Sequence, residues 1–244
     1  MTNWKIANLI KKQVIPIFKK MVDKRKALIF DMDDVLIDVS NSTRVAIKKT
    51  VEFFVGRLIE EEEIEEMRLN EDSEGYYRCI EKLLEKRELY TPREIIKKKF
   101  QEYYINRNFS GLIKNERWML DSKLLNSLSK KYKLGLRSNR GRIETEFALE
   151  LAKAKKYFRS IVTSDDVSGD LDKELMELAK KMNANGTCYV GNSVDDYEAS
   201  KKAELDFIGI IPPKSDKLKY KQILKKRGAK VVLNHVNDIR QAVK

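Results

Sequence analysis

The sequence predicts an α/β protein, built on a doubly wound parallel sheet with an inserted all-helical cap domain. Short apolar runs alternate with helical patterns through residues 121–244, and this alternation is typical of βαβ units. A further apolar run lies far upstream, at residues 27–30. Between the two, residues 42–120 show helical spacing without strand-like alternation, which favours a helical insert after the first strand. The predicted core is therefore 26–41 together with 121–244, and the predicted cap is 42–120.

Residues 1–25 are predicted to be a separate segment, in which apolar side chains alternate with lysines and arginines. Pro16 interrupts the helical pattern, so we expect two short helical pieces rather than one. We favour a terminal amphipathic segment docked on its own domain. Peripheral contact with an anionic membrane, or binding to a partner, stays open as the alternative.

The first strand is predicted from the apolar run Ala27–Phe30, which consists largely of strand formers and ends abruptly in acidic residues. Asp31 follows the run directly, and Asp33 comes two residues later. Because open α/β sheets bind ligands at the carboxyl ends of their strands, both carboxylates are candidates for chemistry. Two carboxylates this close repel each other unless a cation lies between them or one of them holds a proton.

The predicted cap rests on apolar residues at helical spacing, such as Ala46, Ile47 and Val51. Residues 91–94, Thr-Pro-Arg-Glu, predict a capping box with proline at the first helical position, so a new helix is expected to start there. The aromatic residues of this region are expected to fill the cap interior, with a minority facing the cleft. They are Tyr76, Tyr77, Tyr90, Tyr103, Tyr104 and Trp118.

Residues 121–244 are predicted to alternate helices and strands in a regular order. Right-handed crossovers would bring the carboxyl ends of these strands to one edge of the sheet. The expected helices are 122–131, 144–155, 171–182 and 195–203, and the expected strands are 133–137, 160–163, 187–190 and 206–211, followed by a last strand and helix within 230–243.

Composition narrows the classes of function. The chain has 244 residues and a net charge of +12, which favours anionic partners such as phosphorylated metabolites, nucleic acid or an acidic membrane surface. Cys79 and Cys188 form no CxxC pair, which fits a reducing, cytoplasmic setting. His235 is the sole histidine, so histidine-cluster chemistry is excluded, as is a Ser-His-Asp triad without His235. No apolar run approaches the roughly 18 residues that a membrane span needs.

The pentapeptide 31–35, Asp-Met-Asp-Asp-Val, resembles the Asp-x-Asp-x-(Thr or Val) motif of the haloacid dehalogenase (HAD) superfamily. The order of motif, helical insert and later loops is similar to its phosphatase-like branch with a helical cap, subfamily IA, which includes phosphoglycolate phosphatases and β-phosphoglucomutases. This resemblance implies a Rossmann-like core, with Asp31 as the nucleophile and Asp33 as the acid/base. It also implies that Ser138, with the backbone amide of Asn139, holds a phosphoryl oxygen.

Two later motifs depart from the family pattern. In the Gly-Asp-x-x-x-Asp loop, Gly191 and Asp196 match, but Asn192 replaces the first aspartate. An amide oxygen can still coordinate Mg²⁺, but it brings no charge. The usual Lys-Pro-x-Pro run is absent as well. Lys173 is expected to replace the lysine of that run, and Arg140 and Arg142 are the alternatives.

The resemblance therefore implies a Mg²⁺-dependent phosphatase that acts on a small phosphorylated substrate. A phosphomutase would have the same core. The rival is a non-enzymatic module that binds phosphate, nucleic acid or a protein partner, with nucleic acid the less favoured; the altered motifs and the net charge of +12 motivate it. The implied metal ligands are Asp31, Asp33, Asn192 and Asp196, and the implied phosphate-binding residues are Ser138, Asn139 and Lys173.

Overall fold

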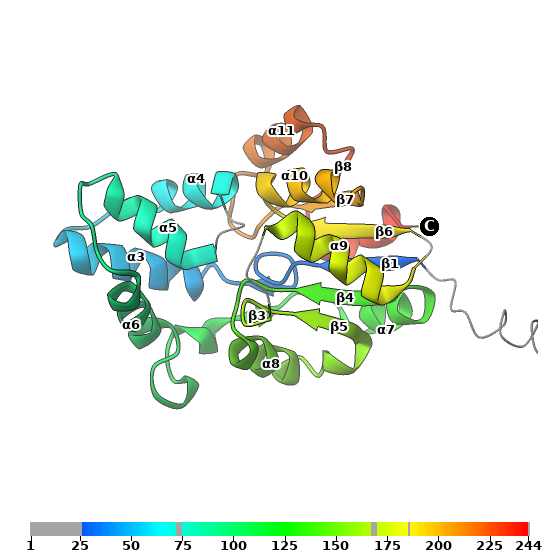
Figure 1. Ribbon diagram of the computed structural model, residues 1–244, viewed down its shortest axis with the longest axis horizontal. Helices are drawn as coiled ribbons and strands as arrows, with labels where there is room; N and C mark the ends of the chain where they lie inside the picture. The colour runs from blue at the N-terminus through cyan, green and yellow to red at the C-terminus, as the bar shows by residue number, and fades with distance from the viewer. Residues whose placement is uncertain (1–25, 72–74, 167–169, 185, 244) are drawn as a thin grey trace, which may run out of the picture.

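The computed structural model describes residues 26–71, 75–166, 170–184 and 186–243. These residues form two neighbouring units, a sheet flanked by helices and a group of helices beside it (Figure 1). The sheet is six-stranded and parallel, in the order β5-β4-β1-β6-β7-β8, which confirms the predicted doubly wound core. Its strands are β1 (Ala27–Phe30), β4 (Lys133–Arg137), β5 (Phe158–Val162), β6 (Thr187–Gly191), β7 (Asp206–Ile210) and β8 (Val231–Leu233).

Helices cover both faces of this sheet, as fully buried parallel strands require. Since neighbouring residues of a strand point to opposite faces, Leu28 and Phe30 belong to one apolar cluster, and Ala27 and Ile29 belong to another. The first cluster includes α7 (Ser122–Lys131) and α8 (Arg142–Leu151), and the second includes α9 (Leu171–Met182) and α10 (Val194–Lys202). A further helix, α11 (Lys217–Arg227), packs against β8 through Leu224 and Val232.

The helical unit lies at the left of Figure 1, on the side to which the strands point. It has its own core, in which the ring of Tyr76 stacks on Phe100 with centroids 4.6 Å apart. Tyr104 is also buried there, whereas Tyr90 is exposed, contrary to expectation, and Trp118 lies outside the helices. The predicted helical cap is thus confirmed, as α3 (Thr43–Val55), α4 (Glu61–Glu71), α5 (Gly75–Glu85) and α6 (Arg93–Tyr104).

The two chain segments that join the sheet to the cap pair with each other. β2 (Ile37–Asp38) and β3 (Arg117–Trp118) form a short antiparallel sheet, in which Ile37 lies opposite Trp118. Arg117 Nη2 lies 2.7 Å from Asp38 Oδ2 across this pair. The sequence pattern did not predict this sheet, because two-residue strands carry no periodicity. The β2–β3 pairing holds the two connecting segments together where the cap joins the core.

Two local predictions were wrong. The capping box at residues 91–94 does not form: α6 begins one residue later, with Pro92 as its N-cap and no side-chain capping bond, and the Glu94 carboxylate pairs with Lys97. The helix expected at about 144–155 is present as α8, with the bounds Arg142–Leu151. The last helix is a short 3-10 segment, η6 (Val236–Gln241). The prediction of helices in residues 1–25 lies outside the described residues.

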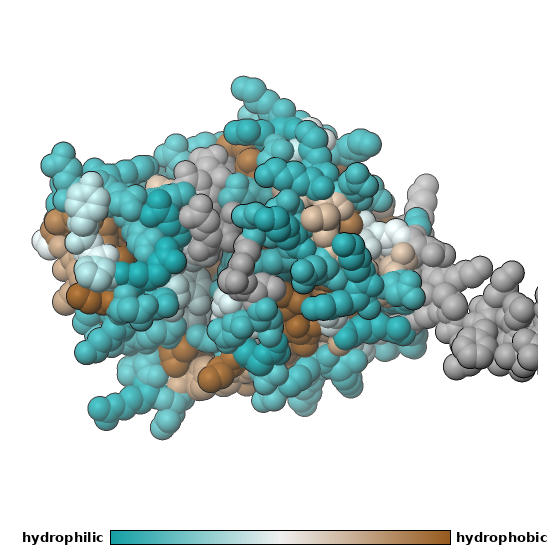
Figure 2. Space-filling view, in the orientation of Figure 1, coloured by the Kyte–Doolittle hydropathy of each residue, from teal (hydrophilic) through white to brown (hydrophobic). Residues whose placement is uncertain are grey.

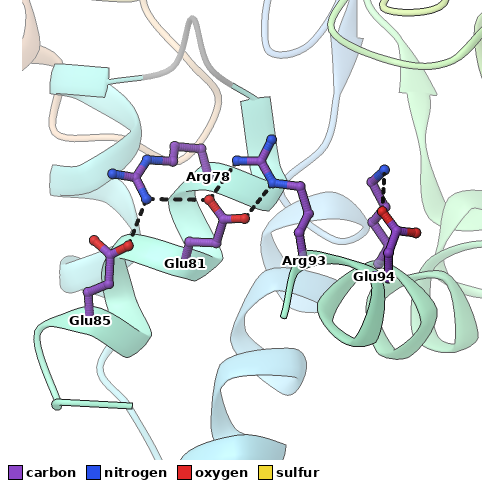
Figure 3. Close-up of polar contacts among 6 residues, drawn as sticks. Arg78, Glu81, Glu85, Arg93 and Glu94 are labelled. Atoms are coloured by element: carbon purple, nitrogen blue, oxygen red, sulfur yellow. Dashed lines mark hydrogen bonds and ion pairs between the residues drawn. The ribbon is translucent and has the colours of Figure 1, made fainter. Parts of the chain in front are cut away.

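The face of the molecule shown in Figure 2 is mostly hydrophilic. On the cap, Arg93 of α6 donates through Nε and Nη2 to the Glu81 carboxylate of α5, at 2.5 and 2.6 Å, and Arg78 Nη1 donates to Glu85 at 2.8 Å (Figure 3). Pairs this exposed contribute about 1 kcal/mol at most. None of the helices in the described ranges is long and apolar enough to cross a bilayer.

Candidate functional site

The candidate site is the edge of the sheet at which β1, β4 and β6 end. Because Phe30 pairs with Leu136 on one side and with Val190 on the other, the loops that follow these three strands begin next to each other. The cap reaches this edge: a Cβ added to Gly75, at the start of α5, would lie 3.8 Å from Asn139 Cβ. The topology therefore brings Asp31, Ser138 and Asn192 to one place, beside the cap.

Asp31 is held firmly at the tip of β1. Its backbone N–H donates to Val190 O at 2.8 Å, which extends the β1–β6 pairing by one residue, and the side chain is buried. The loop then turns at Asp34, which has a φ of +60°, an angle that few residues other than glycine adopt. Asp34 is itself buried and pairs with Arg44 of α3 at 2.9 Å. The loop that carries the two candidate carboxylates is thus attached to the cap.

Asp33 is joined to the cap by a buried arginine. Arg140 is 0% exposed; its Nε donates to Asp33 Oδ1 at 2.6 Å, and its two Nη atoms donate to the Glu116 carboxylate at 2.7 and 2.9 Å. Glu116 also accepts from Tyr104 Oη at 2.9 Å and from Ser42 Oγ at 3.0 Å. Although burial opposes its charge, these neighbours, Asp33 foremost, raise the pKa of Arg140 well above its usual value. Arg140 thus links the first loop to both cap connections.

The predicted phosphate-binding residues lie in different environments. Ser138 is buried; its backbone N–H donates to Val162 O, and its Oγ accepts from the Arg140 N–H at 3.1 Å. A hydroxyl that accepts one bond can still donate its own proton to a ligand. Lys173, by contrast, has a side chain that is 68% exposed, and its Nζ lies 2.8 Å from Asp170 Oδ2. Asn139 faces the start of α5, as described above.

Asp196 shapes the loop after β6. Its Oδ2 accepts from the backbone N–H groups of Asn192 and Ser193, both at 2.9 Å, and its Oδ1 accepts from Tyr189 Oη at 3.0 Å. Ser193 Oγ in turn accepts from the Asp196 N–H, which completes a capping box at the start of α10. A Cβ at Gly191 would lie 2.7 Å from Asp196 side-chain atoms, so only glycine permits this fold-back. A cation would have to share the Asp196 oxygens with these donors.

Asn192 carries an oxygen without a partner. The residue is 2% exposed, and its buried Oδ1 has no hydrogen-bond partner within the described part of the chain. Such an acceptor is costly unless a cation or a donor reaches it. Among the described residues, no group of three or more His, Cys, Asp or Glu could hold a metal ion. Oxygen ligands such as the Asp31 carboxylate and the Asn192 amide suit a hard cation such as Mg²⁺, although together they bring only one negative charge.

Comparison with known proteins identifies the family. The family model for haloacid dehalogenase-like hydrolases matches residues 28–210. The chain belongs to this family. Among curated proteins, none matches the chain.

Solved structures of HAD proteins share the fold. A phosphatase, Tt82, from Thermococcus thioreducens has 25% identity and a TM-score of 0.57, over 82% of this chain and 99% of that one. A HAD-superfamily hydrolase of subfamily IA from Geobacter sulfurreducens has 18% identity and a TM-score of 0.58, over 90% and 100%. A predicted phosphoglycolate phosphatase from Haemophilus somnus has 14% identity and a TM-score of 0.69, over 90% and 98%.

Arg137 lies next to this candidate site, although its place there was not predicted from the sequence. It is the last residue of β4 and only 5% exposed, and its Nε donates to Glu174 Oε2 of α9 at 3.0 Å. Burial opposes its charge, but Tyr189, Glu174 and Asp31 outweigh the burial and raise the pKa of Arg137. The signal in the sequence was an arginine at the end of the strand Lys133–Arg137, together with a glutamate in the first turn of the helix at 171–182.

The loop after β5 is held by Asp166. Its Oδ2 accepts from the Thr163 N–H and Oγ1, both at 2.8 Å, and its carboxylate pairs with Arg142 at 2.5 Å. The Arg142 bond is the main reason that the pKa of Asp166 falls from 3.8 to about 2. A carboxylate with a lowered pKa stabilises the fold above its unfolded pKa and loses that contribution as the pH falls through the folded value.

We therefore expect Asp166→Asn to lower the free energy of unfolding at neutral pH, by less than about 1 kcal/mol because the pair is partly exposed. The difference from wild type should shrink as the pH falls from 3.8 toward about 2. Urea unfolding of both proteins over this range checks it. A difference that does not change with pH would show that the Asp166 carboxylate is not ion-paired in solution.

Proposed function

We propose that this chain is a Mg²⁺-dependent phosphatase for small phosphorylated substrates, and that it forms an aspartyl phosphate on Asp31. One observation carries the proposal: Asp31 directly follows the central strand β1, between the strand that leads to Ser138 and the strand that leads to Asn192, whose Oδ1 has no partner among the described residues. The helical cap beside this edge and the phosphatases among the structural neighbours support it. We also propose a cytoplasmic location, which two free cysteines fit.

Each residue of the candidate site is proposed to have its own role in the reaction. Asp31 attacks phosphorus in line with the leaving oxygen. Ser138 Oγ and the Asn139 amide hold the equatorial oxygens of the phosphoryl group. Asp33, the proposed acid/base, protonates the leaving oxygen and then accepts a proton from the water that hydrolyses the intermediate. Mg²⁺, held by Asp31, the Asp33 carbonyl, Asn192 and the Asp196 loop, would reduce the repulsion between a carboxylate and a phosphate dianion.

Phosphate release from p-nitrophenyl phosphate and a panel of phosphorylated metabolites tests the proposal. We expect steady release that requires Mg²⁺ and stops when EDTA is added. Formation of an isomeric sugar phosphate, with little inorganic phosphate, would indicate a phosphomutase instead. If the protein retains RNA in a salt-sensitive way and turns over none of the phosphorylated compounds, the binding module, which the +12 charge favours, replaces the enzyme.

Asn192→Asp tests the proposed role of this residue at the metal. A second carboxylate in place of the amide oxygen should strengthen Mg²⁺ binding on the order of 10 to 100-fold. The Mg²⁺ concentration for half-maximal activity should fall accordingly. As a matched control, Asn183→Asp changes the same amide at the C-cap of α9, distant from the candidate site, and should leave the Mg²⁺ requirement unchanged. An equal requirement in Asn192→Asp and wild type would remove Asn192 from the metal site.

A further inference from the structure

Asp31 and Arg137 lie side by side on one face of the sheet. The parallel pairing of β1 with β4 places Phe30 opposite Leu136, so the next two residues, Asp31 and Arg137, are neighbours in register. Side chains at paired positions point to the same face. That face is the one covered by α9, since Ile29 packs there with Leu175 and α9 contacts both strands. The buried arginine thus shares a face with the candidate nucleophile.

The Arg137–Glu174 pair has no obvious role in stability. Both side chains are almost fully buried, at 7% and 6% exposed, and the two are 3.0 Å apart. Apolar residues of similar size commonly serve a core as well as a buried ion pair does, or better. A buried cation next to the proposed nucleophile therefore calls for a chemical reason, and the approach of a phosphate dianion to Asp31 provides one.

Other cations that the sequence suggested for this task are engaged elsewhere. Lys173 is on the surface and pairs with Asp170, and Arg142 pairs with Asp166, also near the surface. Arg140 is directed to Asp33 and Glu116. Arg137, unlike these three residues, is next to Asp31 in the register of the sheet.

We propose that Arg137 is a positioning residue for Asp31: it provides the positive charge that keeps the carboxylate in place for attack, and Glu174 fixes the direction of the guanidinium. This inference rests on the proposed function. It assigns to the end of β4 the charge that the family places on a lysine in the loop after β5. Glu174 sits in the first turn of α9, so the orientation of this helix determines where the charge lies.

A double variant separates chemistry from structure. Arg137→Met alone should lower kcat for p-nitrophenyl phosphate on the order of 100-fold, with a smaller change in KM, and should also lower Tm. Arg137→Met combined with Glu174→Met removes the whole pair and should restore Tm, but not kcat. Arg137→Lys keeps the charge and should retain more activity than Arg137→Met. If kcat of the double variant recovers together with Tm, the pair is only structural and the inference is wrong.

Lys133 offers a matched control at the other end of β4. It is buried, and its Nζ donates to the backbone oxygens of Met182 and Asn183 at the end of α9. Lys133→Met should lower Tm without changing kcat per folded molecule. An equal loss of kcat in Lys133→Met and Arg137→Met would contradict the inference.

Binding of inorganic phosphate, measured by calorimetry, decides the inference even if the wild type releases no phosphate and the proposed function fails. Phosphate binding that is at least 10-fold weaker in the double variant than in wild type supports the proposal that the charge of Arg137 acts at this site. Binding that is absent from the wild type, or equal in both proteins, overturns the inference.

Discussion

Asp31→Asn should lower phosphatase activity by about 10⁴-fold or more, because the amide cannot act as the nucleophile. The two other candidate-site carboxylates offer no substitute at the same place: Asp33 is paired with Arg140, and Asp196 is bonded within its own loop. Steady-state release of phosphate from p-nitrophenyl phosphate, normalised to the folded fraction, measures the effect.

Asp38→Asn is the matched control for Asp31→Asn. Asp38 is also a buried carboxylate of the same chain segment, but it bonds Ser40 and Arg117 at the base of the cap. These contacts lower the pKa of Asp38 in spite of burial, so the variant should lose some stability at neutral pH while it keeps most of its activity. Similar activity losses in the two variants would mean that Asp31 acts through the fold and not as the nucleophile.

Arg140→Leu should lower the free energy of unfolding by about 3–5 kcal/mol, because it leaves the partly buried carboxylates of Asp33 and Glu116 without their fully buried cation. The contacts are close, at 2.6 and 2.7 Å, and the guanidinium is fully buried, so solvent cannot replace it without disrupting the packing. Urea unfolding at neutral pH measures the change. Since Glu116 also bonds Tyr104 and Ser42, the cap should open more readily as well.

Arg142→Leu provides the comparison for Arg140→Leu. Its guanidinium side chain is 41% exposed and pairs with Asp166, which is 33% exposed, so the expected loss is under about 1 kcal/mol. Stability losses of similar size in the two variants would show that Arg140 is hydrated in solution and does not connect the cap to the core.

The fold could be predicted from the sequence because its evidence is local. Short apolar runs, such as Ala27–Phe30 of β1 and the Leu-Gly-Leu centre of β4, alternate with helical patterns, and right-handed crossovers then fix the common edge. Asp31, Ser138 and Asn192 could be assigned to this edge for the same reason: each follows a strand closely. The HAD resemblance added the roles of these residues, which spacing alone does not contain.

The arginines could not be assigned in the same way, because their partners are distant in the chain. Arg140 meets Asp33 across 107 positions, and Arg137 meets Glu174 across 37. The register of β1 against β4 places Asp31 beside Arg137, and the packing of α9 places Glu174 beside it. Neither contact can be predicted from local periodicity. Lys173 was favoured because it is close in sequence to the expected motif, but a lysine in the first turn of a helix can point to solvent, as it does here.

Borohydride reduction during turnover tests most directly whether Asp31 forms the covalent intermediate, because borohydride reduces the acyl group of an aspartyl phosphate but not a free carboxylate. Reduction should convert Asp31, and no other aspartate, to homoserine during turnover, as mass spectrometry of the peptide would show. An enzyme that turns over steadily with Asp31 unreduced would contradict the covalent mechanism.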